Sequence, residues 1–211
     1  MPTTGEIKWE YFNLPNIPIY QTKLPQDIID RLWGYIDKAT EKDNKALAGN
    51  IDLSLKIKDE DDFFMKYVLD PIAKIYLSNC GTPMVQNSYN NKPEKLLLNK
   101  FWVNFQKQHE FNPLHKHGGV FSFVIWMKIP TDYKEQHALP ISANSNAPCA
   151  SNFQFVYSDV LGRVQDYQVV MHEEQEGWML LFPSELKHQV YPFYNCDEQR
   201  VSISGNVSWD V

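Results

Sequence analysis

The sequence is poor in cysteine, with only Cys80, Cys149 and Cys196 among 211 residues and no C-x-x-C spacing. An odd number of widely spaced cysteines argues against a disulfide framework and against a zinc site built from thiolates, and it favours a reducing, intracellular compartment. The N-terminus lacks the apolar core of a signal peptide, and no run approaches the roughly 18 apolar residues of a membrane span. We therefore expect a cytoplasmic protein with no membrane partner.

Basic clusters are also absent. The formal net charge is −6, and no block or stripe of lysine and arginine is visible. This pattern argues against a nucleic-acid partner. No internal repeat or low-complexity segment is present either. What the chain does contain is 43% hydrophobic and 14% aromatic residues, enough to bury a core in a chain of this length. We predict a single domain over residues 1–211.

The first ninety residues alternate extended and helical patterns. After a proline-bounded extended segment, residues 24–39 carry apolar side chains at i+4 spacing, which predicts an amphipathic helix. Residues 59–77 open with acidic side chains and predict a second helix, which Pro71 should kink or break. Residues 79–94 are rich in turn formers and predict a loop. Residues 1–92 are thus expected to form an N-terminal strand and helices that support the core of the same domain, which residues 93–211 form.

From about Leu96 the pattern changes to strands. Several short segments rich in aromatic and β-branched residues are separated by turn residues, which predicts an antiparallel sandwich or barrel over residues 93–211. Residues 131–151 form a long polar connection of the kind that often serves as a lid or a binding loop. The predicted strands cover residues 96–107, 119–130, 152–160, 165–171, 177–183, 187–193 and 199–209.

Two histidines stand one residue apart in the segment "FNPLHKHGG". If residues 114–119 are extended, His115 and His117 project from the same face and could chelate one divalent ion. A firm site for a first-row metal needs a third protein ligand. The best candidate is His188, which lies between two apolar segments in "LFPSELKHQVYPF".

Arg200 and Ser202 stand at i, i+2 on the last predicted strand and therefore share a face. The guanidinium group is always charged, and its planar fork matches a carboxylate. An arginine and a hydroxyl inside an apolar barrel are therefore expected to hold an anion. Each of these fragments alone has an ordinary structural explanation. Their joint order, H-x-H, a distal histidine and then R-x-S, is much more selective.

That order resembles the iron(II)/2-oxoglutarate-dependent oxygenases, whose core is a double-stranded β-helix (a cupin-like jelly-roll) preceded by helices. The sequence looks closest to a branch common in genomes of marine tailed phages, which would imply the host cytoplasm. The segment "LAGNI" at residues 47–51 also fits this branch. The matching motif residues are Trp102, Val103, Asn104, Asn112, Pro113, His115, His117, Ser122, Phe182, Pro183, Ser184, His188, Val190, Pro192, Arg200, Ser202, Ser204, Gly205 and Asn206.

The resemblance implies a mainly β fold with N-terminal helices and the chemistry of a dioxygenase, an oxidoreductase that uses Fe(II), O2 and 2-oxoglutarate as co-substrate. His115, His117 and His188 would bind the iron, and Arg200 with Ser202 would hold the distal carboxylate of 2-oxoglutarate. Asn104 and Asn112 either bind the co-substrate or form ordinary turn and strand-end contacts. The implied reaction is hydroxylation, as in prolyl hydroxylases, of a protein side chain or a small metabolite.

One position departs from the family pattern, because His117 occupies the place of the usual carboxylate ligand. Either His117 binds the metal, or it stands off and water or halide fills the gap; zinc or nickel also suits such a nitrogen-rich site. Rival readings remain open from the sequence, among them the same fold with a purely structural metal. Two of them are other functions. One is a cupin-type metal enzyme that does not use 2-oxoglutarate, and the other is a non-enzymatic jelly-roll binding module. The primary substrate is not indicated.

Overall fold

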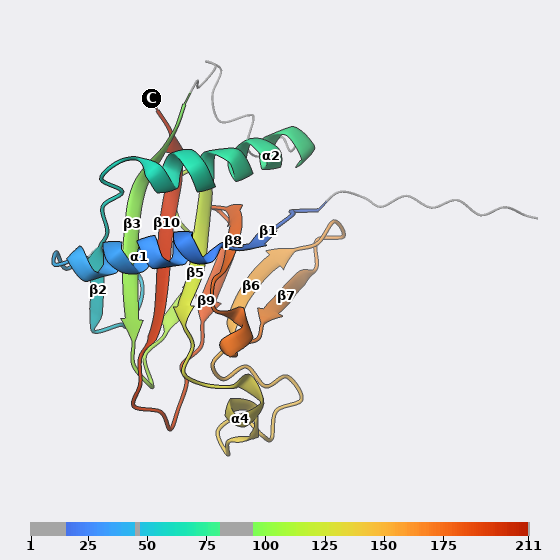
Figure 1. Ribbon diagram of the computed structural model, residues 1–211. Helices are drawn as coiled ribbons and strands as arrows, with labels where there is room; N and C mark the ends of the chain where they lie inside the picture. Colours follow the sequence, from blue (N-terminus) through green and yellow to red (C-terminus); the bar gives the residue numbers. More distant parts are fainter. Residues whose placement is uncertain (1–15, 45–46, 81–94, 211) are drawn as a thin grey trace, which may run out of the picture.

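The computed structural model describes residues 16–44, 47–80 and 95–210, and it consists of two antiparallel sheets with a helical layer (Figure 1). The larger sheet has the strand order β1-β8-β5-β10-β3-β2, and the smaller has the order β4-β9-β6-β7. Together they form a double-stranded β-helix, as expected. The strands are β1 (Tyr20–Lys23), β2 (Leu53–Lys56), β3 (Leu96–Gln106), β4 (Asn112–His115), β5 (Phe121–Lys128), β6 (Phe153–Ser158), β7 (Val164–Val169), β8 (Trp178–Pro183), β9 (Lys187–Val190) and β10 (Arg200–Trp209).

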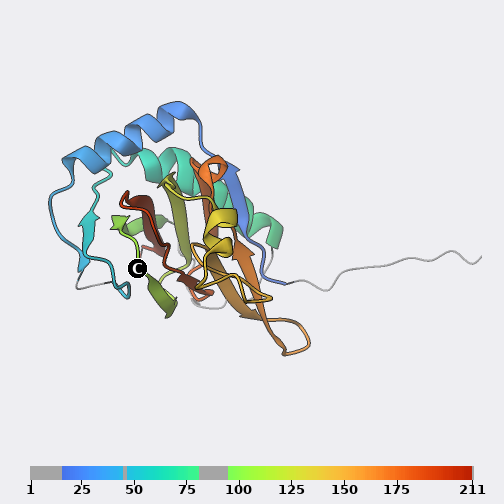
Figure 2. The ribbon, with the colours of Figure 1, turned by 90° about the horizontal axis from the view of Figure 1, so that it is seen from below.

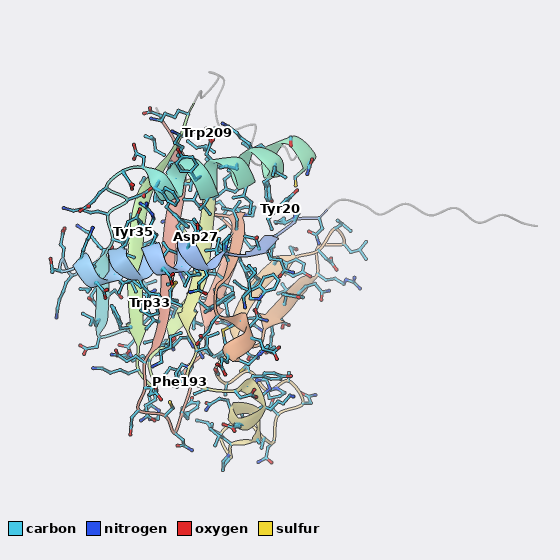
Figure 3. All side chains as sticks on the ribbon, viewed as in Figure 1. Tyr20, Asp27, Trp33, Tyr35, Phe193 and Trp209 are labelled. Carbon is cyan, nitrogen blue, oxygen red and sulfur yellow. The ribbon has the colours of Figure 1, made fainter. Side chains whose placement is uncertain are left out.

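Two helices, α1 (Gln26–Lys38) and α2 (Asp70–Cys80), cover one face of the six-stranded sheet. Figure 2 shows both helices on the same side of this sheet, with β6 and β7 on the other. The fully buried Leu32 anchors α1 in the apolar layer between the helices and the sheet. Tyr35 lies between α1 and α2 (Figure 3), and its hydroxyl contacts Asp59 at 3.0 Å.

The larger sheet carries an apolar layer on each of its two faces, because successive side chains of a strand point to opposite faces. On β10, Val201, Ile203 and Val207 pack against the helices, whereas Arg200 and Ser202 face the smaller sheet. Since side chains alternate along a strand, every second residue of β5, β8 and β10, and of β3 from Trp102 onward, points into the space between the two sheets. A second apolar cluster, formed around β5, β6 and β8, fills much of that space. The site described below lies on this inner side.

Pro71 does not break the second helix. A π-helical turn over Met65–Leu69 runs directly into α2, and Pro71 takes the second position of α2. Proline cannot donate the hydrogen bond of a regular helix and crowds the preceding turn, and a π-turn at that place relieves both problems. The carboxylate of Asp59 accepts hydrogen bonds from the backbone N–H groups of Phe64 and Met65 and so caps the helix start.

All seven strands predicted after residue 96 are present, at nearly the expected positions. The sequence pattern did not predict β2 or α4 (Tyr133–Ala138), which lies inside the connection 131–151. Most of the predicted loop over residues 79–94 falls outside the described residues. Within the described part of the chain, no helix is long and apolar enough to cross a membrane.

Candidate metal and 2-oxoglutarate site

The three predicted histidines come together at one end of the smaller sheet. His115 ends β4 and pairs directly with His188 on β9, while His117 follows two residues after the strand. The ring centroids are 4.4 Å apart for His115 and His188, 4.9 Å for His115 and His117, and 5.1 Å for His117 and His188. One ring nitrogen of each histidine lies within 4.8 Å of the other two. Three imidazoles at this spacing can surround one metal ion.

Backbone carbonyls fix the ring orientation of two of these histidines. Nδ1 of His115 lies 2.7 Å from the carbonyl oxygen of Pro113, and Nδ1 of His188 lies 2.9 Å from that of Leu186. A carbonyl can only accept a hydrogen bond, so Nδ1 must carry the proton in both rings. The lone pair of each ring is therefore on Nε2. Metal-binding histidines commonly show this arrangement.

Burial keeps the triad neutral. It lowers the pKa of His188 to about 3 and that of His117 to about 4, and it also lowers the pKa of His115. Desolvation penalises the charged imidazolium, and the neighbouring imidazoles add to this effect for His117 and His188. At neutral pH all three rings are uncharged, which is the state that binds a metal. Among the described residues, no aspartate or glutamate joins this group.

His117 reaches the group by a different route from the one that the sequence suggested. The segment 114–119 is not one continuous strand, because β4 ends at His115. The backbone N–H of His117 donates to the carbonyl oxygen of Ser184 at 2.9 Å, and its ring lies 5.7 Å from that of Trp102. Gly119, with φ of +109°, then turns the chain into β5. A side chain there would lie 2.8 Å from the carbonyl oxygen of Val207, so glycine is required.

The same turn also places Ser122, one of the motif residues that match the family pattern. A regular strand through His117 would point Ser122 away from the histidines. The chain instead changes sheets, so Ser122 lines the cavity that also contains His115 and His117. Its hydroxyl donates to Oδ1 of Asn206 at 2.9 Å and lies 3.2 Å from that of Ser184.

Arg200 also lines this cavity and is 2% exposed. Its Nη2 donates to Oγ of Ser151, its Nη1 lies 3.5 Å from Oε1 of Gln106, and its Nε is buried without a partner. The guanidinium carbon stands 5.2 Å from the ring of Phe193, which Figure 3 shows at the end of the larger sheet. No acidic side chain in the described part of the chain forms a salt bridge with Arg200. Burial lowers its pKa to about 9, and it remains charged at neutral pH.

The other predicted co-substrate residues also line this cavity. Ser202 follows Arg200 by two residues on β10, so that both face the cavity. It pairs with Asn104 on the neighbouring strand β3. Asn104 is buried, and its Oδ1 accepts a hydrogen bond of 2.7 Å from Ser54. Asn112 packs closely against the segment 47–51, because a Cβ atom added at Gly49 would lie only 1.9 Å from Oδ1 of Asn112.

Sequence reasoning did not find Ser151 and Gln106. They lie 49 and 94 residues away from Arg200, and neither belongs to a recognisable pattern. The only available signal was that Gln106 follows Trp102 and Asn104 at two-residue steps on one strand face, which placed it next to the predicted site.

The fold and the site define a jelly-roll protein in which three histidines that could hold a metal ion line the same cavity as a buried cation. A family model described as "Putative 2OG-Fe(II) oxygenase" matches residues 100–206, and the chain belongs to this family. The family uses Fe(II), 2-oxoglutarate and O2. No curated protein matches the sequence.

Solved structures show the same fold at low sequence identity. A prolyl-4-hydroxylase from Pseudomonas putida is 14% identical, with a TM-score of 0.52 over 92% of this chain and 94% of that one. The non-heme alpha-ketoglutarate-dependent epimerase SnoN from nogalamycin biosynthesis is 13% identical, with a TM-score of 0.50 over 92% of this chain and 79% of that one.

The residues present fit both groups that the family uses. Fe(II) accepts neutral imidazole nitrogen, and three such donors converge here. The distal carboxylate of 2-oxoglutarate fits the unneutralised guanidinium of Arg200, whose Nε has no protein partner. The family is therefore supported by the site as well as by the sequence match.

Proposed function

We propose that the protein is an Fe(II)- and 2-oxoglutarate-dependent hydroxylase. His115, His117 and His188 hold the metal in this proposal, and Arg200 with Ser202 holds the distal carboxylate of 2-oxoglutarate. The observation that carries it is the buried guanidinium on the same inner surface as the imidazole group, with only neutral partners.

A buried charge without a counter-ion is costly, and proteins normally avoid it by pairing. Here the chain provides a serine, a glutamine and the ring of Phe193 around Arg200. Such a surrounding is reasonable if a ligand brings the negative charge. A metal enzyme that does not use 2-oxoglutarate has no need for this cation, and a non-enzymatic module needs neither the cation nor the imidazoles.

The bound Fe(II) supplies the activation of O2 that couples oxidative decarboxylation of 2-oxoglutarate, to succinate and carbon dioxide, with oxidation of the substrate. The chain positions the reactants and excludes water. Phe153 stacks on the ring of His188 at 5.5 Å, and Phe182 meets the same ring edge-on at 5.0 Å. These rings keep one side of the metal site dry.

We further propose that Asn104 and Asn112 contact the co-substrate. Because Oδ1 of Asn104 accepts from Ser54, the amide NH2 group is the part that can donate to a carboxylate oxygen. Asn112 lies at the boundary between the metal cavity and the segment 47–51, where the primary substrate would approach. That substrate is a protein side chain or a small metabolite. The fold likeness to a prolyl-4-hydroxylase makes a peptidyl proline the first to test.

The most direct experiment is an anaerobic titration of the protein with Fe(II) and 2-oxoglutarate. We expect the visible charge-transfer band of a metal-chelated keto acid, followed by succinate release on admission of O2. His188→Ala should abolish the band, whereas His172→Ala, at a histidine outside the triad, should preserve it. Arg200→Ala should keep the metal and require far more 2-oxoglutarate to produce the band.

Other outcomes would favour the rival functions. Metal binding without a 2-oxoglutarate band would indicate a cupin-type metal enzyme of another class, and failure to bind any divalent metal would indicate a binding module. The three cysteines are free thiols, which suits the reducing cytoplasm that we propose as the site of action.

A further inference from the structure

Ser151 ends the long connection 131–151 and is completely buried beside Arg200. Its Oγ accepts a hydrogen bond of 2.5 Å from Nη2 of Arg200 and lies 3.2 Å from Oγ1 of Thr131. Its backbone has φ of +73°, in the left-handed region that residues other than glycine, asparagine and aspartate seldom adopt. A strained backbone that presents a hydroxyl to a buried cation suggests a functional position.

The neighbourhood holds Ser151 rigidly in this conformation. Its N–H donates to the carbonyl oxygen of Pro192 at 2.8 Å. Two residues further on, the backbone of Tyr194 forms two hydrogen bonds with the side chain of Gln136 on α4, at 2.9 and 2.8 Å. These hydrogen bonds therefore join the connection 131–151 to the loop after β9 on the side of Arg200 where Ser151 lies.

The chemical type of Ser151 is as informative as its position. A hydroxyl accepts a hydrogen bond from the guanidinium but leaves its positive charge intact. An aspartate would neutralise the cation and compete with any incoming carboxylate, although aspartate adopts the left-handed conformation more readily than serine does.

We propose that Ser151 is a positioning residue for Arg200. It fixes the direction in which the remaining N–H groups of the guanidinium face the cavity, so that they meet the distal carboxylate of 2-oxoglutarate, and it does so without adding a competing negative charge. This inference rests on the proposed role of Arg200 in binding 2-oxoglutarate.

The first test is Ser151→Gly, which removes the hydroxyl and at the same time relieves the left-handed backbone. Calorimetry with Ni²⁺-loaded protein should show that the variant binds 2-oxoglutarate about tenfold more weakly than the wild type, or weaker still. The melting temperature of the ligand-free variant should equal that of the wild type or exceed it. The matched control is Asn195→Gly. Asn195 is exposed, also has a positive φ of 56°, and its backbone N–H donates to Oε1 of Gln108. It should retain wild-type affinity.

A second pair of variants isolates charge at constant size. Ser151→Asn places a neutral acceptor beside Arg200 and should retain measurable 2-oxoglutarate binding. Ser151→Asp places a carboxylate there and should abolish binding, while the ligand-free protein melts no lower than Ser151→Asn.

Wild-type affinity in Ser151→Gly, or equal affinities in the Asn and Asp variants, would overturn the positioning role and leave the proposed function intact. A wild-type protein that binds Ni²⁺ but not 2-oxoglutarate would overturn both. Reduced affinity in Ser151→Gly accompanied by an equal reduction in Asn195→Gly would show a general effect of the backbone and would also overturn the inference.

Discussion

Arg200 and His188 are both large polar side chains removed from water, but the fold satisfies them to different degrees. His188 is neutral, and its Nδ1 bonds to the carbonyl oxygen of Leu186. Arg200 is charged, and its Nε has no partner. Folding therefore completes the hydrogen bonding of Nδ1 of His188 and leaves its Nε2 free to bind a metal in the proposed function. At Arg200 it leaves a positive charge with only neutral partners among the described residues.

Replacing Arg200 should separate ligand binding from stability. We expect Arg200→Met to leave the free energy of unfolding of the ligand-free protein unchanged or up to about 2 kcal/mol higher, because an uncompensated buried charge is removed. The stabilisation by 2-oxoglutarate, about 2.7 kcal/mol at a concentration of 100 times Kd in the wild type, should disappear. Thermal melts of metal-loaded protein with and without 2-oxoglutarate measure both effects. The exposed Arg163→Met serves as control, and retained stabilisation in Arg200→Met would contradict the assignment.

The question of whether His117 is a ligand is also settled by substitution. His117→Ala should lower the affinity for Co²⁺ by more than the ~10–100-fold that loss of an outer partner costs in metal sites. His117→Asp restores the carboxylate of the usual family pattern and should recover most of that affinity. Competition with a chromogenic chelator gives both values. If His117→Ala binds Co²⁺ as the wild type does, the metal is held by His115 and His188 with solvent or an exogenous ligand.

Motif spacing grouped the three histidines, Arg200 and Ser202, and all five line one cavity. His117 joins them through the turn after β4 and not through strand alternation. Strand alternation carries the local information for Arg200 and Ser202. It could not predict Ser151. The hydroxyl reaches Arg200 only because the connection 131–151 packs against the loop after β9. Contacts made by an irregular segment depend on the whole packing arrangement and leave no periodic signal.

At the level of elements, β10 is one of the two middle strands of the larger sheet and carries Arg200 and Ser202 on one face and residues of the helical core on the other. On the helical face, the ring of Phe123 from β5 lies directly over Gly205. A Cβ added at Gly205 would stand 2.5 Å from a ring carbon of Phe123 and 2.7 Å from the carbonyl oxygen of Lys100. Glycine is therefore needed for close packing of three neighbouring strands.

We expect Gly205→Ala to lower the free energy of unfolding by about 1–3 kcal/mol, as overpacking in a core does. The matched control is Gly34→Ala in α1, where an added Cβ meets no atom within 4 Å. That variant should raise stability by about 0.5–1 kcal/mol because alanine favours the helix. Urea unfolding of both variants measures the contrast. Equal effects would show that backbone preference, and not contact with Phe123, decides the role of Gly205.

The turn between β6 and β7 depends on Asp159. Its carboxylate accepts hydrogen bonds from the Arg163 side chain, from the backbone N–H of Arg163 and from that of Leu161. These contacts, the Arg163 side chain first, lower the pKa of Asp159 below the ordinary value of 3.8. Since the folded pKa lies below the unfolded one, this support is present above about pH 4 and is lost as pH falls through the folded value.

The amide resonances of Leu161 and Arg163 should therefore titrate together with a midpoint below 3.8 in NMR spectra. In Asp159→Asn their titration should disappear. A midpoint at or above the ordinary value would show that the carboxylate does not hold this turn.

Elements were predicted where the surrounding sequence segment carried a regular pattern, as for the four-residue β9 inside residues 187–193. β2 and α4 lie in segments without such a pattern. The long strands β3, β5 and β10 carry eight or more residues each and were recognised from alternation. β2 has four residues and α4 has six, which is too few for a clear period without a regular pattern around them. The strand expected across residues 114–119 ends at His115, since two glycines at positions 118 and 119 let the chain cross to the other sheet.

In the whole molecule, the larger sheet separates the helical layer from the site. Leu32 on α1 packs with Ile203 in the outer core, whereas Arg200 and the histidines face inward. The sheet is shared by both layers, so the N-terminal helices are expected to fold together with the barrel, as the prediction of a single domain over residues 1–211 requires.

Leu32→Ala tests this coupling. The side chain is fully buried, and its truncation should lower the free energy of unfolding by about 2–5 kcal/mol. If helices and barrel form one cooperative unit, far-UV circular dichroism and the fluorescence of the buried tryptophans should shift together to lower urea, with one transition each. The affinity of the folded variant for 2-oxoglutarate should remain that of the wild type, because the substitution lies across the sheet from Arg200. The exposed Lys38→Ala in the same helix should change little. Separate transitions, with the helical signal lost first and the tryptophan signal unshifted, would divide the chain into two folding units.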